Sequence, residues 1–147
     1  MKISTRSRYG IRLMLALALG YQKGPLFLKD IAKKEAISEK YLSQIIIPLR
    51  SQGLVNSFRG AHGGYVLAKG PEEITVREIV ETLEGGLVLI DELNGSDDSR
   101  SASLLVTRQI WDEIADSIIR NLEAITLRIL VERYQEKTSK TAVNYNI

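Results

Sequence analysis

One stretch, residues 37–68, constrains the fold of this chain more than any other. It begins with ISEKYLSQIIIPLRSQGLV, in which Leu42, Ile45, Ile46 and Leu49 recur at the helical spacing i, i+3, i+4, i+7. It ends with RGAHGGYVLA, whose glycines permit the positive φ angles of a tight turn between two alternating strands. A polar-faced helix followed directly by a β-hairpin is the arrangement of a winged helix-turn-helix domain.

Other helices are predicted on both sides of this stretch. Residues 5–21 carry apolar side chains on one helical face, and a short helix over 28–35 follows a Gly-Pro break. Ser38 is a suitable N-cap for the helix that comes next. Thr75 and Glu78 are spaced as a capping box ahead of a further amphipathic helix. The fold class predicted is therefore mainly α with one small β-hairpin.

The charge of the chain is divided unevenly along its length. Residues 1–60 carry eleven Lys and Arg against three acids, a net charge of +8, whereas residues 61–147 carry nine against fifteen, a net charge of −6. A basic half beside an acidic half is expected where one half meets a polyanion and the other meets protein. A solvated lysine-rich surface is the plainer alternative. Because the basic half coincides with the predicted helix and hairpin, we favour DNA as its partner.

The first helix also begins with cations, namely Arg6, Arg8 and Arg12. Cations at the N-terminus of a helix oppose the helix dipole. Their presence is easier to understand if a phosphate lies nearby, so Arg6 and Arg8 join the candidate DNA contacts.

The predicted helix and hairpin present several side chains suited to DNA. Lys40, Ser43 and Gln44 lie opposite the apolar stripe, and a glutamine can form paired hydrogen bonds with adenine. Arg59 opens the hairpin, where a guanidinium could enter a narrow minor groove. His62 at the tip is a turn residue or a phosphate contact. Each of these residues taken alone is equally consistent with an ordinary exposed surface.

A long amphipathic helix is predicted over residues 104–136. A helix of roughly 30 residues is about 45 Å long, more than a domain of this size can cover. Its apolar stripe consists of Leu104, Trp111, Ile114, Ile118, Leu122, Ile125 and Ile129. We expect this stripe, from Trp111 onward, to pair with a second copy of the chain as a two-fold dimer. The alternative is a helix that folds back on its own domain.

The composition argues against catalysis and against a membrane segment. The chain has no cysteine, and its one histidine, His62, lies in a glycine-rich turn. Asp97 and Asp98 stand in a small polar segment with nothing to orient them against a nucleophile. No apolar run is long enough to cross a bilayer, and the N-terminus lacks the pattern of a signal peptide. We expect a cytoplasmic protein that is not an enzyme.

Several segments together resemble one family of bacterial regulators. They are MKISTRSRYGIRLML, LKDIA, ISEKYLSQIIIPLRSQGLV, RGAHGGYVLA and EEITVREIVETLEG, in order within residues 1–85, and WDEIADSIIRNLEAITLRIL further on. On these segments the chain is similar to the Rrf2 family of winged-helix transcriptional regulators. The resemblance implies a homodimer that binds a palindromic operator in double-stranded DNA, usually as a repressor. The candidate DNA-binding residues are Arg6, Arg8, Ser38, Lys40, Tyr41, Ser43, Gln44, Arg59, Gly60, His62 and Gly63.

The resemblance also bears on cofactors. Cluster-binding members of the family carry three cysteines between the linker helix and the dimer helix. The corresponding segment here, GGLVLIDELNGSDDSRSASLL, has none, and Arg108 stands where a further ligand can lie. An arginine does not bind iron. We therefore expect no iron–sulfur cluster, no other metal and no other cofactor.

Among the cluster-free members, the chain resembles repressors of cysteine metabolism. The opening MKIST, the hairpin and the final isoleucine carry this resemblance. It implies cysteine synthase as a partner, with Tyr145, Asn146 and Ile147 inserting a terminal carboxylate into the active site of that enzyme. The alternative for these residues is an unengaged flexible tail.

The sequence thus predicts four parts. Residues 1–85 form a winged helix-turn-helix DNA-binding domain with a linker helix, and residues 86–103 form a flexible loop at the family's cluster position. Residues 104–136 form a dimerisation helix, and residues 137–147 form a flexible tail. The second functional hypothesis is a protein-interaction regulator that acts mainly through this tail on a metabolic enzyme.

Overall fold

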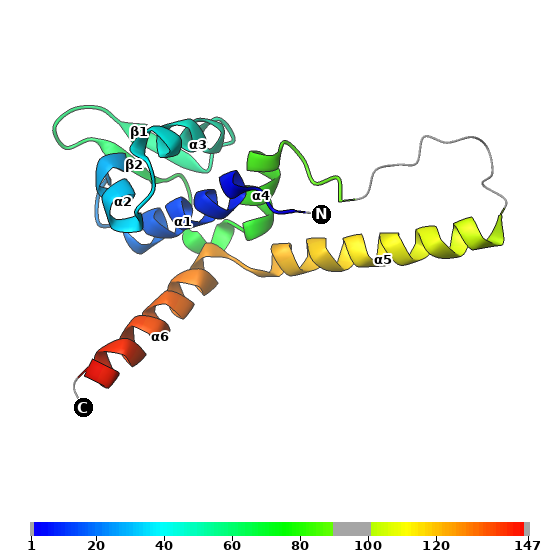
Figure 1. Ribbon diagram of the computed structural model, residues 1–147. Coiled ribbons are helices and arrows are strands. Elements are labelled where there is room, and N and C mark those ends of the chain that lie inside the picture. The colour runs from blue at the N-terminus through cyan, green and yellow to red at the C-terminus, as the bar shows by residue number, and fades with distance from the viewer. Residues whose placement is uncertain (1, 90–100, 146–147) are drawn as a thin grey trace.

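The protein is described here by a computed structural model that covers residues 2–89 and 101–145 (Figure 1). Its elements are α1 (Thr5–Leu19), α2 (Leu28–Glu35), α3 (Glu39–Ser51), β1 (Val55–Phe58), β2 (Gly64–Leu67), the 3-10 turn η1 (Pro71–Glu73), α4 (Val76–Glu84), α5 (Ala102–Ala124) and α6 (Leu127–Tyr145). The prediction of a mainly α fold with one β-hairpin is confirmed. We call residues 2–84 the head.

The core of the head is built from the apolar stripes of its helices. Leu13 and Leu17 of α1 meet Leu42 and Leu49 of α3, and all four side chains are buried. Removing each such side chain from water contributes roughly 1.5–3 kcal/mol to folding. The stripe predicted on α4 is likewise buried, with Ile79 wholly inaccessible to solvent. The periodicity in the sequence therefore located the core correctly.

The β-hairpin is the wing of the fold. The segment that connects α1 to α2 pairs with β2 and so joins the wing to the helices. β1 and β2 pair antiparallel, with Val55 opposite Leu67 and Phe58 opposite Gly64. Leu26, in the connection between α1 and α2, exchanges two backbone hydrogen bonds of 3.0 and 2.8 Å with Tyr65. Gly64 has a φ of +127°, and a Cβ there would lie 2.6 Å from the Leu26 oxygen, so only glycine fits.

Helices α1 and α4 pack closely along their length. A Cβ added at Gly10 would lie 2.1 Å from Cδ1 of Leu83, so glycine permits this approach. At the end of α4, the Glu84 carboxylate accepts hydrogen bonds from the Ser4 hydroxyl (2.5 Å) and from the buried Ser7 hydroxyl (2.6 Å). The first turn of α1 is therefore held by the last residue of α4.

The predicted helix over 104–136 is wrong as a single helix. The structure has two helices, α5 and α6, which leave the head in different directions because Ile125 adopts extended backbone geometry (Figure 1). The Val76 N–H donates to the Ile125 carbonyl (2.8 Å), and the Leu127 N–H donates to the Ile74 carbonyl (2.9 Å). A short bridge to the start of α4 thus replaces helical hydrogen bonds at this point.

The C-terminal part of the chain is more helical than expected. Leu127 is fully buried against the head, and the residues of the predicted flexible tail continue α6 as far as Tyr145. Residues 146–147, and residues 90–100 of the expected loop, lie outside the described part of the chain. The expected loop also ends earlier than predicted, since Ala102 already begins α5.

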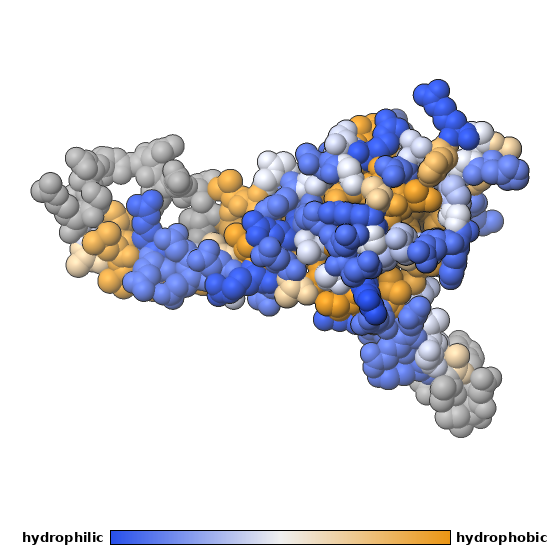
Figure 2. Space-filling model, turned by 180° about the vertical axis from the view of Figure 1, so that it is seen from behind, coloured by the Kyte–Doolittle hydropathy of each residue, from blue (hydrophilic) through white to orange (hydrophobic). Residues whose placement is uncertain are grey.

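Helix α5 projects away from the head. Within the described chain, it buries none of its side chains fully. Figure 2 shows apolar residues at the surface toward its far end, and Leu105, Val106 and Ile110 there are each about half exposed. Among the described residues, no helix combines the length and apolar character needed to traverse a bilayer.

The contact between Glu84 and α1 predicts a pH-dependent contribution to stability. The pKa of the Glu84 carboxyl is lowered, chiefly because Ser4 and Ser7 donate hydrogen bonds to its charged form, with further attraction from Arg6. A lowered pKa in the folded state stabilises the fold above the ordinary carboxyl pKa of about 4.5, and this stabilisation is lost as the pH falls through the lowered value. We expect Glu84→Gln to lower the urea midpoint at pH 7 and to have a smaller effect at pH 3. A reduction of equal size at both pH values would contradict the assignment.

Candidate nucleic-acid interface

Helix α3 presents a polar face to solvent. Its N-cap, Ser38, accepts a hydrogen bond from the Tyr41 N–H at 3.3 Å, and this cap fixes where the helix begins. Lys40, Ser43 and Gln44 are exposed on the first turns. The Ser43 hydroxyl donates to the Glu39 carbonyl at 2.9 Å, which leaves its lone pairs as acceptors. The face predicted from the sequence is therefore accessible.

A shallow groove lies between α1 and the start of α3. Its lining consists of Tyr9, Ala36, Ile37, Ser38, Lys40, Tyr41 and Gln44. The Tyr9 and Tyr41 rings meet edge to face with centroids 5.6 Å apart. Tyr41 is thus half-buried and braces α3 against α1, and only part of it faces solvent. The structure brings four predicted residues together here, namely Ser38, Lys40, Tyr41 and Gln44.

Arg12 joins α1 to the end of α2. Its guanidinium lies 5.7 Å from the centre of the Tyr9 ring, and its Nη2 lies 2.8 Å from the Glu35 carboxylate at the end of α2. The same nitrogen also donates to the Glu35 carbonyl. Arg12 therefore fixes α2 to α1, and the sequence analysis did not assign it this role.

The wing carries the second group of predicted residues. Arg59, Gly60 and His62 are exposed, whereas Gly63 is buried inside the turn with its Cα against the backbone of Phe58. Gly63 thus shapes the wing from within. Arg59 and His62 line a second groove together with Tyr21, Pro25 and Phe58 at the junction of the wing and the α1–α2 connection. The two grooves share no lining residue.

Most cations among residues 1–60 form no ion pair within the described chain. Of the eleven Lys and Arg before residue 61, Arg12 is the one that forms an ion pair within the described chain. Arg6 and Arg8 are exposed on the first turn of α1, and Arg8 donates to the Thr5 hydroxyl at 3.1 Å. The excess positive charge found in the sequence therefore remains at the surface of the fold.

One residue of α3 escaped the sequence analysis. Ile47 is 57% exposed, although it belongs to an apolar run, Ile45–Ile46–Ile47, in which the first two side chains are buried. It follows Lys40 by seven positions and Ser43 by four, so it shares their face. The exposure of this third isoleucine could have been found only by placing it on the helical repeat set by Leu42 and Leu49.

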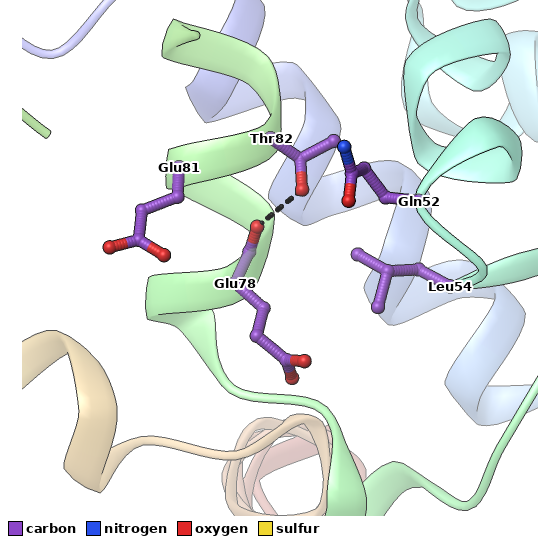
Figure 3. A pocket seen from close by; sticks show the side chains of 5 residues that line it. All are labelled: Gln52, Leu54, Glu78, Glu81 and Thr82. Carbon is purple, nitrogen blue, oxygen red and sulfur yellow. Dashed lines mark hydrogen bonds between the residues drawn. The ribbon is translucent and has the colours of Figure 1, made fainter. Parts of the chain in front are cut away.

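A third groove, between the end of α3 and α4, has a different character. Gln52, Leu54, Glu78, Glu81 and Thr82 line it, and the Thr82 hydroxyl donates to the Glu78 carbonyl (Figure 3). The Glu78 carboxylate pairs with Lys69 at 3.1 Å, and Glu81 pairs with Arg77 at 2.9 Å. Hydrogen bonding and attraction from Glu81 raise the pKa of Arg77. The carboxylates of Glu78 and Glu81 in this groove are therefore neutralised by ion pairs with Lys69 and Arg77.

The residues predicted for dimerisation lie on α5 and at its junction with α6. Trp111 is 53% exposed and Ile114 is 42% exposed. The other four, Ile118, Leu122, Ile125 and Ile129, are partly buried. Of the residues predicted to bind a partner enzyme, Asn146 and Ile147 lie outside the described chain, and only the backbone of Tyr145 is described.

Comparisons with known proteins identify close relatives. The profile of the Rrf2 family, described as an iron-dependent transcriptional regulator, matches residues 3–133. The transcriptional regulator CymR of Bacillus subtilis is 41% identical over 130 residues, which cover 88% of this chain and 89% of that protein. The structure of CymR, the global cysteine regulator of B. subtilis, superposes with a TM-score of 0.80 at 39% identity over 90% of this chain and 98% of that one. T. potens IscR superposes with a TM-score of 0.76 at 37% identity over 93% and 90%.

An iron–sulfur cluster does not fit the donor atoms of this chain. Iron–sulfur clusters are held by cysteine thiolates, and the 147 residues contain no cysteine. Across residues 2–89 and 101–145, no three His, Asp or Glu side chains are grouped closely enough to hold a metal ion. The single histidine lies on the wing. No step in the function is therefore assigned to iron.

Proposed function

The chain belongs to the Rrf2 family of transcriptional regulators, and on this premise we propose that it is a DNA-binding repressor that acts as a two-fold dimer. In this proposal residues 1–85 form the DNA-binding domain, and α5 joins two copies. The observation that carries the proposal is the exposed polar face of α3 next to a wing whose cations have no ion-pair partner among the described residues.

In the proposed complex, α3 enters the major groove with its first turns at the base edges. Gln44 can form paired hydrogen bonds with an adenine, and Lys40 suits a phosphate or a guanine. Ser43 retains acceptor lone pairs for a base amino group. Ile47, exposed on the same face, suits the methyl group of a thymine. Ser38 and Tyr41 set the position of the helix through the cap and the ring contact.

The wing and the first turn of α1 supply the remaining contacts. Arg59 is placed to enter the minor groove, where the negative potential of a narrow groove favours a guanidinium. His62 and the backbone at Gly60 are exposed in the same turn and are assigned to phosphate contacts in this proposal. Arg6 and Arg8 provide phosphate contacts that fix the register without reading sequence.

Pairing through α5 is proposed from its surface. Helix α5 buries no side chain fully among the described residues, yet it exposes Trp111 and Ile114, so it gains stability if a partner covers this face. A two-fold axis through paired α5 helices would present two α3 helices to half-sites one helical turn apart, or a multiple of it. A palindromic operator matches this symmetry.

The regulated genes are proposed to be those of cysteine or sulfur metabolism. CymR, the global cysteine regulator of B. subtilis, is similar to this chain over most of both sequences. The operator can be identified by selecting, from a pool of random DNA duplexes, those that the protein binds. The selected sequence is then searched for in the regions upstream of genes. Selected sites upstream of genes unrelated to sulfur would contradict this assignment.

The residues proposed to contact base edges on α3 and the minor groove on the wing form the reading face. Substitutions in this face are expected to have separable effects on binding to the selected duplex. Arg59→Ala is expected to weaken binding and to relax the preference for A·T pairs under the wing. Gln44→Ala is expected to cost about 1–3 kcal/mol at a single base position, because one bidentate contact is lost. Fluorescence anisotropy on a set of singly substituted duplexes measures both effects.

Two variants serve as controls for this experiment. Gln52→Ala removes a glutamine from the other end of α3, and Arg128→Ala removes an arginine from α6 that is paired with Glu132. Both are expected to bind as the unmodified protein does. If Arg59→Ala and Gln44→Ala bound as tightly and as selectively as these controls, the reading face would be wrong.

The pairing surface predicts a change of oligomeric state. Ile114→Glu places a charge on the proposed seam of α5 and is expected to shift a dimer to a monomer in sedimentation equilibrium, because a desolvated carboxylate opposes association. Val88→Glu places the same charge on an apolar side chain that is 76% exposed outside α5, and is expected to leave the dimer intact. A dimer that persists in the Ile114 variant would place the interface elsewhere.

A further inference from the structure

The contact between α4 and α1 ends in the first turn of α1, which also carries Arg6 and Arg8, the residues proposed to touch DNA phosphates. The Glu84 Oε1 atom accepts three hydrogen bonds, from the Ser4 N–H (3.2 Å), the Ser4 hydroxyl (2.5 Å) and the Ser7 hydroxyl (2.6 Å). Ser4 is the N-cap of α1, and its hydroxyl oxygen in turn accepts from the Ser7 N–H at 3.1 Å. The carboxylate of one helix thus completes the N-terminal cap of another.

This cap has a fixed position. Ser7 is fully buried, so the hydrogen bond that it donates to Glu84 is part of the packed interface between the helices. One turn further along, α1 approaches α4 closely, because a Cβ added at Gly10 would overlap the Leu83 side chain. Arg6 lies between the two serines in sequence, and Arg8 follows directly, so the cap also determines where these two guanidinium groups emerge.

The negative charge of Glu84 at the N-terminus of α1 has a second consequence besides packing. The first turn of α1 contains no acidic residue of its own, although an acid there would stabilise the helix dipole. The negative charge comes instead from the end of α4. An acid supplied from α4 stabilises the turn, while Arg6 and Arg8 stay exposed and form no ion pair among the described residues.

We propose that Glu84 is a positioning residue for DNA binding, which holds the first turn of α1 so that Arg6 and Arg8 meet the phosphate backbone. The inference rests on the proposed function. Glu84 touches no DNA in this arrangement and acts through Ser4 and Ser7. Loss of the carboxylate releases the turn, and the two arginines then contribute less to phosphate neutralisation.

The test measures how binding to a mixed-sequence duplex depends on salt. The slope of log K against log [salt] reports the number of phosphates neutralised, about 0.9 for each contact. We expect Glu84→Ala and Ser7→Ala each to make this slope shallower by about 1 to 2. A variant that was only less stable would have a smaller active fraction, which stoichiometric titration corrects, and would keep the full slope.

A matched control and a second background sharpen this test. Glu81→Gln removes a carboxylate from the same helix that pairs with Arg77, and is expected to keep the slope unchanged. The Arg6→Ala/Arg8→Ala variant should itself have a shallower slope of log K against log [salt]. Adding Glu84→Ala to that variant is expected to leave its slope unchanged. Persistence of its effect in that background, or an unchanged slope for Glu84→Ala alone, would overturn the inference.

The two proposals fail in different ways. If the unmodified protein showed no salt-dependent binding to the duplex, the proposed DNA-binding function would be wrong, and the role of Glu84 with it. If the protein bound DNA but the Arg6→Ala/Arg8→Ala variant kept the full slope, only the role of Glu84 and the first turn of α1 would be overturned.

Discussion

The buried face of α1 is the constraint on which the rest of the structure depends. Leu13, Met14 and Leu17 are wholly or almost wholly inaccessible to solvent, and α2, α3, β2, α4 and α6 all pack against this helix. The helices among them depend on this packing, since most helical stability in proteins comes from the burial of an amphipathic face. Because they share one surface, the orientation of α3 and the wing follows from contacts with a single helix.

The same arrangement separates burial from charge. The head buries its apolar stripes on α1. Ten of the eleven Lys and Arg side chains before residue 61 have no ion-pair partner among the described residues. Exposed ion pairs would add little stability in water, so their absence costs the fold little. The cations remain available to a polyanion, and Arg12, the exception, pairs with Glu35 to hold two helices together.

The sequence predicted most of the head because its signals there are local. The stripe through Leu42 and Leu49, the Ser38 cap and the Thr75–Glu78 capping box each depend on residues a few positions apart, and each is present in the structure. The exposed polar face of α3 followed from the same repeat. The resemblance to the Rrf2 family added the expected contact residues, whose positions on α3 and the wing the structure describes.

The prediction failed where a distant partner decides the local conformation. The residues Ile125 and Thr126 contain no glycine or proline, so periodicity ran through them as one helix. The break exists because backbone groups there pair with Ile74 and Val76, about fifty residues earlier. The one local signal of this break is the β-branched pair Ile125–Thr126, in which Thr126 caps the following turn by accepting from the Ile129 N–H. This signal is weak, because β-branched residues also occur within helices.

What the sequence determined by itself was the identity of the elements, because helical periods, caps and glycines at positive φ act within a few residues. What only the tertiary structure decided was how those elements meet: the bend between α5 and α6, the burial of Gly63, the exposure of Ile47 and the carboxylate of Glu84 at the start of α1. These features depend on contacts between residues far apart in the chain. No local pattern encodes such contacts, since their free energy arises only when the separate helices are packed together.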